Sequence, residues 1–514
     1  MKRLMILAAA VFAMSATTAD TVARVRAWRV EHEKPILREL FDFLSIPNVA
    51  TNQNDIRRNA DALTRMFERR RFAPEILSTG TASSPLVVAE RRLPNVRRTI
   101  TFYFHYDGQP VDPSEWMYEP PFKPVIVAPH DPQGRTLTLD TWQDAIDPEW
   151  RVYGRSSSDD KGPIIAFLAA IEALDASNIP LTSNIRVVME GEEEAGSTHL
   201  EDAVLKYADK IRGDALLLVD GPRHASDRPT INFGARGIMN ALVTVYGAAH
   251  DLHSGNYGNW APNPALQLAR LLASMKDDAG RVTIDGFYDD VTPLTAEEKR
   301  AIDEIPDVAP SLMKTFGFSR PESADRLELR HNLPTLNINA MEAGGGVGGQ
   351  GRTIIPASAS ARLDLRFVKN VEPAKQFDRL VAHIRKQGYF IVDDRGAGAP
   401  GLSGEPDAET RAAHTLIASV SKIGGYPAGR TSMELPIARA IAKAIADGAG
   451  GPIVRLPTLG GSAPFYLFSD VLKVPTIGLS IVNFDNNQHG PNENLRIKNL
   501  WDGIETMAAI LTMP

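Results

Sequence analysis

The sequence predicts an α/β protein whose mostly parallel sheet carries helices on both faces and is interrupted by a smaller α+β domain. Three patterns predict this fold. Apolar strand-like runs alternate with helical stretches of ten or more residues up to about residue 234, which is typical of a parallel sheet. Strands with alternating polar and apolar residues follow, and the last hundred residues return to the first pattern.

The first pattern begins with helical periodicity over residues 22–71. Buried strands and amphipathic helices then alternate along the chain. The expected strands are 99–104, 184–189 and 214–219, and the expected helices between them are 162–177 and 197–211.

The second pattern predicts a separate unit over residues 235–405. Its expected strands are 235–247, 360–368 and 388–395, its helices are 262–276 and 376–388, and residues 278–330 read as an acidic, loop-like insertion. A strand with one polar and one apolar face indicates a sheet that is half exposed.

The last part predicts helices over 410–425 and 433–448 and a buried strand over 474–482. We therefore expect one larger domain over residues 20–234 and 406–514, interrupted by a smaller domain over residues 235–405.

The N-terminus resembles a secretory signal. Lys2 and Arg3 precede an apolar run that ends near Met14, and small residues follow, so that cleavage is expected after Ala16 or Ala19. The run is shorter than the roughly 18 apolar residues that span a bilayer. We expect residues 1–19 to be a signal peptide, an exported (periplasmic or secreted) protein, and no membrane span after its removal.

Composition excludes several classes of function. A formal charge of -7 provides no basic surface for nucleic acid. The absence of cysteine excludes thiol nucleophiles and cysteine-ligated metals. The glycine-rich residues 344–351 precede a strand instead of opening a helix, which argues against a phosphate-binding loop.

Acidic and imidazole side chains follow the expected strands. They are His105 and Asp107, the acidic tract that contains Glu193 and Glu194, Asp220, and His489. Each one alone is explained by a cap, a turn or a solvated loop. Because the carboxyl ends of parallel strands meet at one edge of a sheet, the same ligand type after four strands favours a metal site. Carboxylate and imidazole ligands suit Zn²⁺, Mn²⁺ or Co²⁺.

Nine stretches resemble the M20 metallopeptidases, which include dipeptidases, carboxypeptidases, aminoacylases and desuccinylases. In chain order they are HYDGQP at 105, YGRSSSDDKGP at 153, EGEEEAGS at 190, the strand end at Asp220, HDLHSG at 250, GRTIIP at 351, DLRF at 364, GGSAP at 460 and NQHGPNE at 487.

The resemblance implies a role for each strand-end residue. His105 and Asp220 would hold one divalent metal ion, Glu194 and His489 would hold a second, and Asp159 would bridge them. Asp107 would orient a ligand imidazole, and Glu193 would be the general base. The resemblance also implies a cis peptide bond between Asp159 and Asp160, and zinc as the metal, with manganese or cobalt as alternatives.

The resemblance further implies that residues 20–234 and 406–514 form the metal-binding catalytic domain, and that residues 235–405 form a lid that also dimerises and contributes to the site. His253 would stabilise the reaction's oxyanion from the partner subunit of a homodimer. Arg366 and Thr353 would hold the substrate carboxylate, and Gly461 and Ser462 would line the substrate pocket.

Two positions depart from the family pattern. Gly108 stands where a branched apolar residue is common, and Ser156 stands where glycine is common. Residues 128–150, with Trp142 and Trp150, are expected to form an extra hairpin at the rim of the cleft, and the insertion at 278–330 is expected to reshape the same rim.

These observations predict a dizinc hydrolase of amide bonds in dipeptides or short peptides. An N-acyl-amino-acid deacylase on the same centre is the first alternative. A metal-binding or peptide-binding protein without turnover is the second, although it leaves Glu193 without a role.

Overall fold

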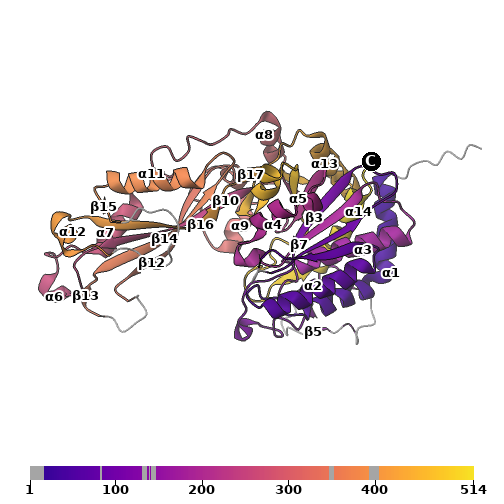
Figure 1. Cartoon of the computed structure of the whole chain (residues 1–514), viewed down its shortest axis with the longest axis horizontal. Helices are drawn as coiled ribbons and strands as arrows, with labels where there is room; N and C mark the ends of the chain where they lie inside the picture. The colour runs from indigo at the N-terminus through magenta and orange to yellow at the C-terminus, as the bar shows by residue number, and fades with distance from the viewer. Residues whose placement is uncertain are drawn as a thin grey trace, which may run out of the picture.

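The computed structural model describes residues 17–80, 84–129, 136–137, 139, 146–345, 352–392 and 405–514. The chain forms two lobes side by side along the long axis of the molecule (Figure 1). The larger lobe is built on an eight-stranded sheet and contains the C-terminus, and the smaller lobe is built on a second sheet.

The eight-stranded sheet has a parallel centre. Its strands, in spatial order, are β1 (Ala73–Leu77), β2 (Leu86–Arg91), β7 (Asn184–Glu190), β3 (Thr99–His105), β8 (Ala215–Val219), β20 (Thr476–Ser480), β9 (Thr230–Asn232) and β18 (Val454–Leu456). Strands β7, β3, β8 and β20 run parallel to one another. Strand β2 pairs antiparallel with both β1 and β7, and β9 pairs antiparallel with β20 and parallel with β18. The predicted strands over 99–104, 184–189, 214–219 and 474–482 are confirmed.

Helices cover both faces of this sheet. One face packs against α1 (Thr18–Leu44), α2 (Gln53–Glu68), α3 (Lys161–Ala176), α13 (Pro436–Ala449) and α14 (Ile497–Leu511). The other face packs against α4 (Leu200–Lys206), α5 (Ala208–Ile211) and the turn Leu467–Val471. The α/β class with helices on both faces is therefore confirmed.

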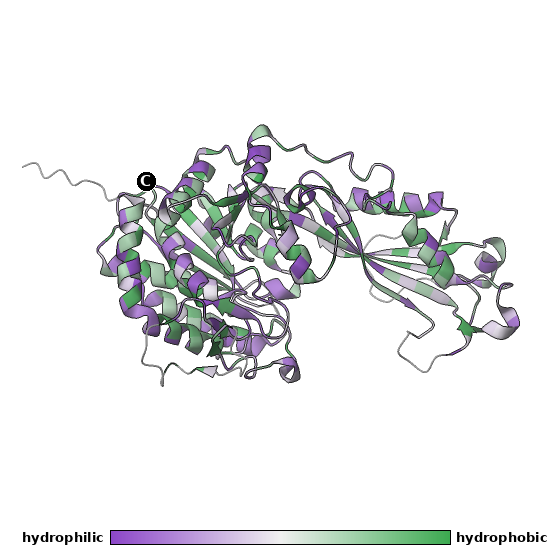
Figure 2. Cartoon of the chain, turned by 180° about the vertical axis from the view of Figure 1, so that it is seen from behind, coloured by the Kyte–Doolittle hydropathy of each residue, from purple (hydrophilic) through white to green (hydrophobic). Residues whose placement is uncertain are grey.

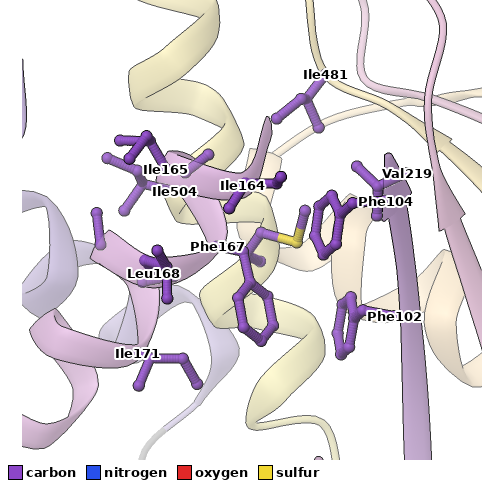
Figure 3. Close-up of a cluster of buried hydrophobic side chains, with 14 of the residues drawn as sticks. Phe102, Phe104, Ile164, Ile165, Phe167, Leu168, Ile171, Val219, Ile481 and Ile504 are labelled. Carbon is purple, nitrogen blue, oxygen red and sulfur yellow. The ribbon is translucent and has the colours of Figure 1, made fainter. Parts of the chain in front are cut away.

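The core of the larger lobe is centred on Phe167 of α3 (Figure 3). Its ring lies 4.9 Å from the ring of Phe102 and 5.7 Å from that of Phe104, both on β3. Side chains alternate between the two faces of a strand, so Phe102 and Phe104 face α3 while Tyr103 faces the opposite layer. Because β3 is buried on both faces, it fixes the position of the residues that follow it.

The smaller lobe is a mostly antiparallel sheet with helices on one face. Its strand order is β12 (Thr335–Ala343), β14 (Ser358–Phe367), β10 (Gly234–Tyr246), β16 (Ile417–Tyr426) and β15 (Phe390–Ile391). The edge strand β15 runs parallel to its neighbour β16, and the other neighbours in this row pair antiparallel. Helices α7 (Pro264–Ala273) and α11 (Pro373–Lys386) cover the face that carries Met239, Leu363 and Leu365. Figure 2 shows the hydrophobic residues along the strands of both lobes and hydrophilic residues on the outer side of α11.

Short strands join and extend the lobes. The start of β10 pairs with β17 (Gly429–Arg430) and β19 (Leu459–Ser462), so this strand links the two sheets. Strands β4 (Val125–Val127), β5 (Thr136–Leu137), β6 (Arg151–Tyr153) and β21 (Asn494–Arg496) form a small separate sheet, and β11 (Leu252–His253) pairs with β13 (Ile354–Ile355). The pairing of β4 with β5 falls in the predicted hairpin region, where Trp142 lies outside the described residues and Trp150 packs on the main core.

The helix predicted over 410–425 is wrong beyond Ala413. Helix α12 covers only Ala408–Ala413, and residues 417–426 form β16, which pairs with β10 along its length. Long-range pairing with an already half-buried strand outweighs the local helical pattern, because strand propensity depends on the cross-strand neighbours. Strand β16 therefore belongs to the smaller lobe, although its residues lie within 406–514, the range expected to form part of the larger domain.

The insertion at 278–330 is not loop-like throughout. It contains α8 (Ala296–Asp303), α9 (Ala309–Phe316) and α10 (Leu327–Arg330). Arg455 of β18 anchors α8, with ion pairs of 2.7 Å to Glu297 and 2.8 Å to Glu304. Most of residues 344–351, the glycine-rich run, lie outside the described residues.

The predicted export is wrong. Residues 1–16 lie outside the described residues, but α1 begins at Thr18, within the predicted signal segment. Thr17 caps this helix: its hydroxyl accepts from the Asp20 amide at 3.2 Å, and the Asp20 carboxylate accepts from the Thr17 amide at 3.1 Å. Cleavage after Ala19 would remove a capping box of an ordered 27-residue helix that packs on the main core. Among the described helices, none is both long and apolar enough to cross a membrane.

Candidate metal centre

The candidate site lies at the carboxyl edge of the parallel strands. His105 is the last residue of β3, the acidic tract follows β7, Asp220 follows β8, and His489 lies in the loop after β20. Since these strands are parallel neighbours, their ends converge on one edge. Asp159 comes from a different place, the turn between β6 and α3.

Two clusters of ligand atoms form there and share one residue. His105, Asp159 and Asp220 make the first, and Asp159, Glu194 and His489 make the second. Within each cluster the ligand atoms lie within 4.8 Å of one another. Among the described residues, no other group of His, Cys, Asp and Glu meets this geometry. The sequence named these five residues as candidate ligands, and the fold brings them together.

Asp159 lies between the two imidazoles. One carboxylate oxygen, Oδ1, is 2.8 Å from His105 Nε2, and the other, Oδ2, is 3.2 Å from His489 Nε2. His489 Nε2 is also 3.4 Å from Glu194 Oε2. The peptide bond between Asp159 and Asp160 is cis, as the resemblance implied. His105 is fully buried while the His489 side chain is 56% exposed, so the two clusters differ in their access to solvent.

The electrostatics of the site favour a cation. Burial, and then the charge of Asp159, raise the pKa of Glu194 to about 8 and that of Asp220 to about 6. Burial first, and then the charges of Asp220 and Glu194, raise the pKa of Glu193 well above its usual value. Neighbouring carboxylates cannot all ionise at neutral pH without a compensating charge. The donor set, two imidazoles and three carboxylates, therefore fits divalent metal ions.

Asp107 and Glu193 lie beside the ligands. Asp107 Oδ1 is 3.3 Å from His105 Nδ1, the nitrogen turned away from Asp159, and Asp107 Oδ2 accepts a hydrogen bond from the Glu194 amide at 2.9 Å. This carboxylate therefore contacts one candidate ligand and the backbone of another. Glu193 immediately precedes Glu194 and belongs to neither cluster.

Glu493 is a buried carboxylate that the sequence reasoning missed, although it ends the NQHGPNE stretch. It is fully buried, and it accepts hydrogen bonds of 2.8 to 2.9 Å from the amides of Ser156, Ser158 and Asp159. Arg155 also contacts it at 2.9 Å. Glu493 therefore fixes the turn that presents Asp159. The only signal in the sequence was the position of Glu493 four residues after His489, a candidate ligand.

The two family departures contact each other beside the site. Ser156 has a positive φ of 63°, the conformation that glycine adopts most readily. Its hydroxyl accepts a hydrogen bond from Asn48 Nδ2 at 2.9 Å. A Cβ on Gly108 would lie 2.6 Å from this hydroxyl oxygen. The absence of a side chain at Gly108 therefore leaves the space that the Ser156 hydroxyl occupies.

The candidate substrate residues fall into two groups. Arg366 on β14 donates to the Ser462 hydroxyl at 2.8 Å, so these two meet where the lobes join, and Gly461 precedes Ser462 on β19. His253 and Thr353 lie together on the β11 and β13 pair, where the Ser254 amide donates to the Thr353 carbonyl at 3.0 Å. Figure 1 shows β13 and the adjoining α6 (Ser254–Tyr257) at the tip of the smaller lobe, far from β3 and β7. Within one chain the fold does not bring His253 to the metal-ligand clusters.

The sequence profile of peptidase family M20/M25/M40 matches residues 101–513. The chain belongs to this family. The match begins in β3 and ends in the last residues of the chain, so it includes every residue of the two ligand clusters.

Among curated relatives, the chain is 28% identical to the Cys-Gly metallodipeptidase DUG1 of Saccharomyces cerevisiae over 448 residues, covering 85% of this chain and 84% of that one. It is 26% identical to the human Beta-Ala-His dipeptidase over 442 residues, covering 83% and 76%.

Among solved structures, an M20 family metallo-carboxypeptidase from Sulfolobus solfataricus superposes with a TM-score of 0.74 at 29% identity, covering 93% of this chain and 98% of that one. Human carnosine dipeptidase 1 has the same fold, with a TM-score of 0.74 at 21% identity, covering 95% and 98%. These likenesses support the α/β fold with a smaller lid lobe.

Proposed function

We propose that this protein is a dinuclear metal-dependent hydrolase that cleaves the amide bond of dipeptides. The observation that carries the proposal is the pair of ligand clusters sharing Asp159. The names of the relatives, a Cys-Gly metallodipeptidase and a Beta-Ala-His dipeptidase, support dipeptides as the substrate class.

The five clustered residues would hold two divalent ions, with zinc as the first choice. His105 and Asp220 would hold one ion, Glu194 and His489 would hold the other, and Asp159, which belongs to both clusters, would contribute to both. When bound, the ions would polarise the scissile carbonyl and lower the pKa of water at the centre. Three carboxylates with two imidazoles and no sulfur suit zinc, with manganese or cobalt as alternatives.

Glu193 has the properties of the general base. It precedes the ligand Glu194 and belongs to neither cluster, so that no ligand role occupies its carboxylate. It would accept a proton from the attacking water and deliver it to the leaving nitrogen. Asp107, 3.3 Å from His105 Nδ1, would hold that imidazole in the orientation that leaves Nε2 free for a metal ion.

Arg366 is suited to bind the substrate carboxylate. Its guanidinium now contacts Asp364 at 2.8 and 3.0 Å and Ser462 at 2.8 Å, so it is fixed at the junction of the lobes. A planar guanidinium binds a carboxylate through two parallel hydrogen bonds. Gly461 and Ser462 would form the neighbouring wall of the pocket.

We also propose that the smaller lobe acts as a lid in a homodimer. His253 and Thr353 are at its tip, away from the clusters of their own chain, so they would reach the metals of a second subunit. The domain division that we propose keeps residues 20–234 and 406–514 for catalysis and 235–405 for the lid, with β16 added to the lid sheet.

The test is metal analysis of the purified protein followed by rates on a panel of dipeptides and N-acyl amino acids. The proposal expects about two divalent ions per chain and faster hydrolysis of dipeptides. Faster hydrolysis of N-acyl amino acids would favour a deacylase on the same centre. Bound metal without any hydrolysis would support a binding protein and overturn the proposal.

A further inference from the structure

A row of three side chains crosses the lid sheet at the junction of the lobes. Ile238 on β10 pairs with Arg366 on β14 and, on its other side, with Tyr426 on β16. Residues paired directly across strands direct their side chains to the same face of a sheet. Arg366, Ile238 and Tyr426 therefore form one continuous row.

This row lies on the sheet face that the lid helices leave uncovered. Along β10 the residues Met239, Ala241 and Val243 are buried in the lid core under α7 and α11. Ile238 alternates with these residues along the strand, so its side chain points to the other face, where it is half-buried. On β14, Leu365 and Phe367 are buried in the same core, which leaves Arg366 on the face with Ile238.

A bulge in β16 puts Tyr426 on this face. The register between β10 and β16 is regular from Tyr246↔Ile417 to Asn240↔Ile423 and then shifts, so that Ile238 faces Tyr426 instead of residue 425. Without the extra residue, Tyr426 would point into the lid core, because a slip of one residue reverses the face.

Two glycines make the bulge possible. Gly424 and Gly425 have positive φ angles of 59° and 122°. A Cβ on Gly425 would lie 2.5 Å from the Ile238 carbonyl oxygen. The backbone at this bulge therefore requires glycine, and its effect is to direct Tyr426 toward the junction of the lobes.

Tyr426 also contacts the larger lobe. Burial, and then the charge of Glu193, raise the pKa of the Tyr426 hydroxyl well above its usual value. Its ring stacks on that of Tyr466, with centroids 5.7 Å apart, and Tyr466 donates to Glu201 of α4 at 3.2 Å. An aromatic pair thus extends from the lid sheet to the helix that follows the acidic tract.

We propose that Tyr426 is a specificity-determining residue that closes the substrate cleft opposite Arg366 and restricts substrates to two residues, with Ile238 as an apolar floor for the side chain next to the carboxylate. This inference rests on the proposed hydrolase function and on Arg366 as the carboxylate site.

The distance across the row from Arg366 to Tyr426 matches the length of a dipeptide. Neighbouring strands lie about 4.8 Å apart, so the backbones that carry Arg366 and Tyr426 are about 10 Å apart. Two extended residues span about 7 Å and three span about 10 Å. A dipeptide held by Arg366 fits before the Tyr426 ring, whereas the third residue of a tripeptide would collide with it.

The test compares kcat/KM of the metal-loaded wild type and Tyr426→Ala on dipeptides and on tripeptides with the same C-terminal residue. Removing the ring should raise the tripeptide-to-dipeptide ratio at least about tenfold. Ile238→Ala should lower kcat/KM about tenfold for dipeptides ending in leucine and leave those ending in glycine unchanged.

Leu242→Ala is the matched control. Leu242 lies on the same face of β10 as Ile238, four residues further along and paired with Arg362, so it should change neither preference. Circular dichroism and thermal unfolding verify that each variant is folded. If Tyr426→Ala does not fold, the effect of Ile238→Ala on the preference for leucine over glycine tests the proposal instead.

Each outcome separates this inference from the proposed function. A wild-type enzyme that hydrolyses no dipeptide overturns both. A wild type that hydrolyses dipeptides, with unchanged length and side-chain preferences in Tyr426→Ala and Ile238→Ala, overturns the specificity role alone. Equal loss of activity on all substrates would show that the Tyr426–Tyr466 stack only holds the lobes together, and it would overturn the role as well.

Discussion

The Ser156 hydroxyl occupies the space that a side chain on Gly108 would need: a Cβ at position 108 would lie 2.6 Å from Ser156 Oγ. Ser156 also keeps a positive φ of 63° and accepts a hydrogen bond from Asn48. The two positions that depart from the family pattern are therefore coupled, and they lie next to Asp107 and near the Asp159 turn.

Gly108→Ala should destabilise the protein by about 1 to 3 kcal/mol, because the added methyl overpacks this contact. Combining it with Ser156→Gly should restore most of that loss, since the glycine removes the hydroxyl and readily adopts positive φ. A double-mutant cycle from denaturant unfolding measures the coupling. Gly451→Ala, at a position with no atom within 4 Å, is the control. Additive effects of the two substitutions would contradict the coupling.

Glu193→Gln should retain the bound metal and lose hydrolysis by about 100-fold or more, because the amide cannot accept the proton from the attacking water. Metal content by mass spectrometry and kcat on a dipeptide measure the two properties. Glu192→Gln is the neighbouring control, since Glu192 contacts His199 rather than a ligand cluster. Near-normal kcat in Glu193→Gln would exclude it as the base.

Glu493→Gln should destabilise the fold by about 3 to 5 kcal/mol, since it leaves the buried Arg155 without its partner. The amide group would also face N–H donors that now bind the carboxylate. Metal affinity should fall together with stability, because Glu493 holds the Asp159 amide. Glu119→Gln removes an ion pair with the exposed Lys123 and should cost about 1 kcal/mol or less. Equal losses in the two variants would contradict the positioning role.

The metal-free protein should lose stability as pH rises from 5 to 8. The pKa of Asp220 is raised to about 6 and that of Glu194 to about 8, chiefly by burial, and the hydrogen bond to Asp159 raises the pKa of His489 to about 9. In this window the folded state binds more protons than the unfolded state, so the free energy of unfolding falls with rising pH. The lowered pKa of Asp159 acts in the opposite direction, but only below this window.

Thermal unfolding of the chelator-treated protein at the two pH values measures this effect, which should be roughly 2 kcal/mol. Adding zinc at pH 8 should restore the stability. Glu194→Gln, which removes one of the titrating groups, should show a smaller pH dependence without metal. A metal-free wild type that is more stable at pH 8 than at pH 5 would refute this assignment.

His253→Ala should be inactive by itself if the partner subunit's active site needs this imidazole. Mixing it in equal amounts with the inactive Glu193→Gln should recover part of the activity, because a mixed dimer contains one site with both residues intact. Activity after subunit exchange, together with the mass in solution, tests this. A monomer, or no recovery in a verified mixed dimer, would contradict the shared site.

The sequence by itself determined where the candidate ligands occur. His105, the acidic tract and Asp220 follow apolar strands whose burial on both faces is encoded by continuous hydrophobic runs. Parallel strands that end at one edge bring such residues together, so a local pattern was sufficient to indicate a metal site there. Asp159, which follows no strand of this sheet, was named only through the family resemblance.

Only the tertiary structure decided the features that depend on pairing between distant segments. Residues 417–426 have a helical local pattern, yet they form β16 because β10 offers a partner along ten residues. The same pairing, with its bulge at Gly424 and Gly425, turns Tyr426 to the face of the lid sheet that α7 and α11 leave uncovered. Glu493 gains its role because the Asp159 turn, more than 300 residues earlier, donates its amides there. The physical reason is that strand register and buried hydrogen bonds depend on the partner, which the local sequence does not specify.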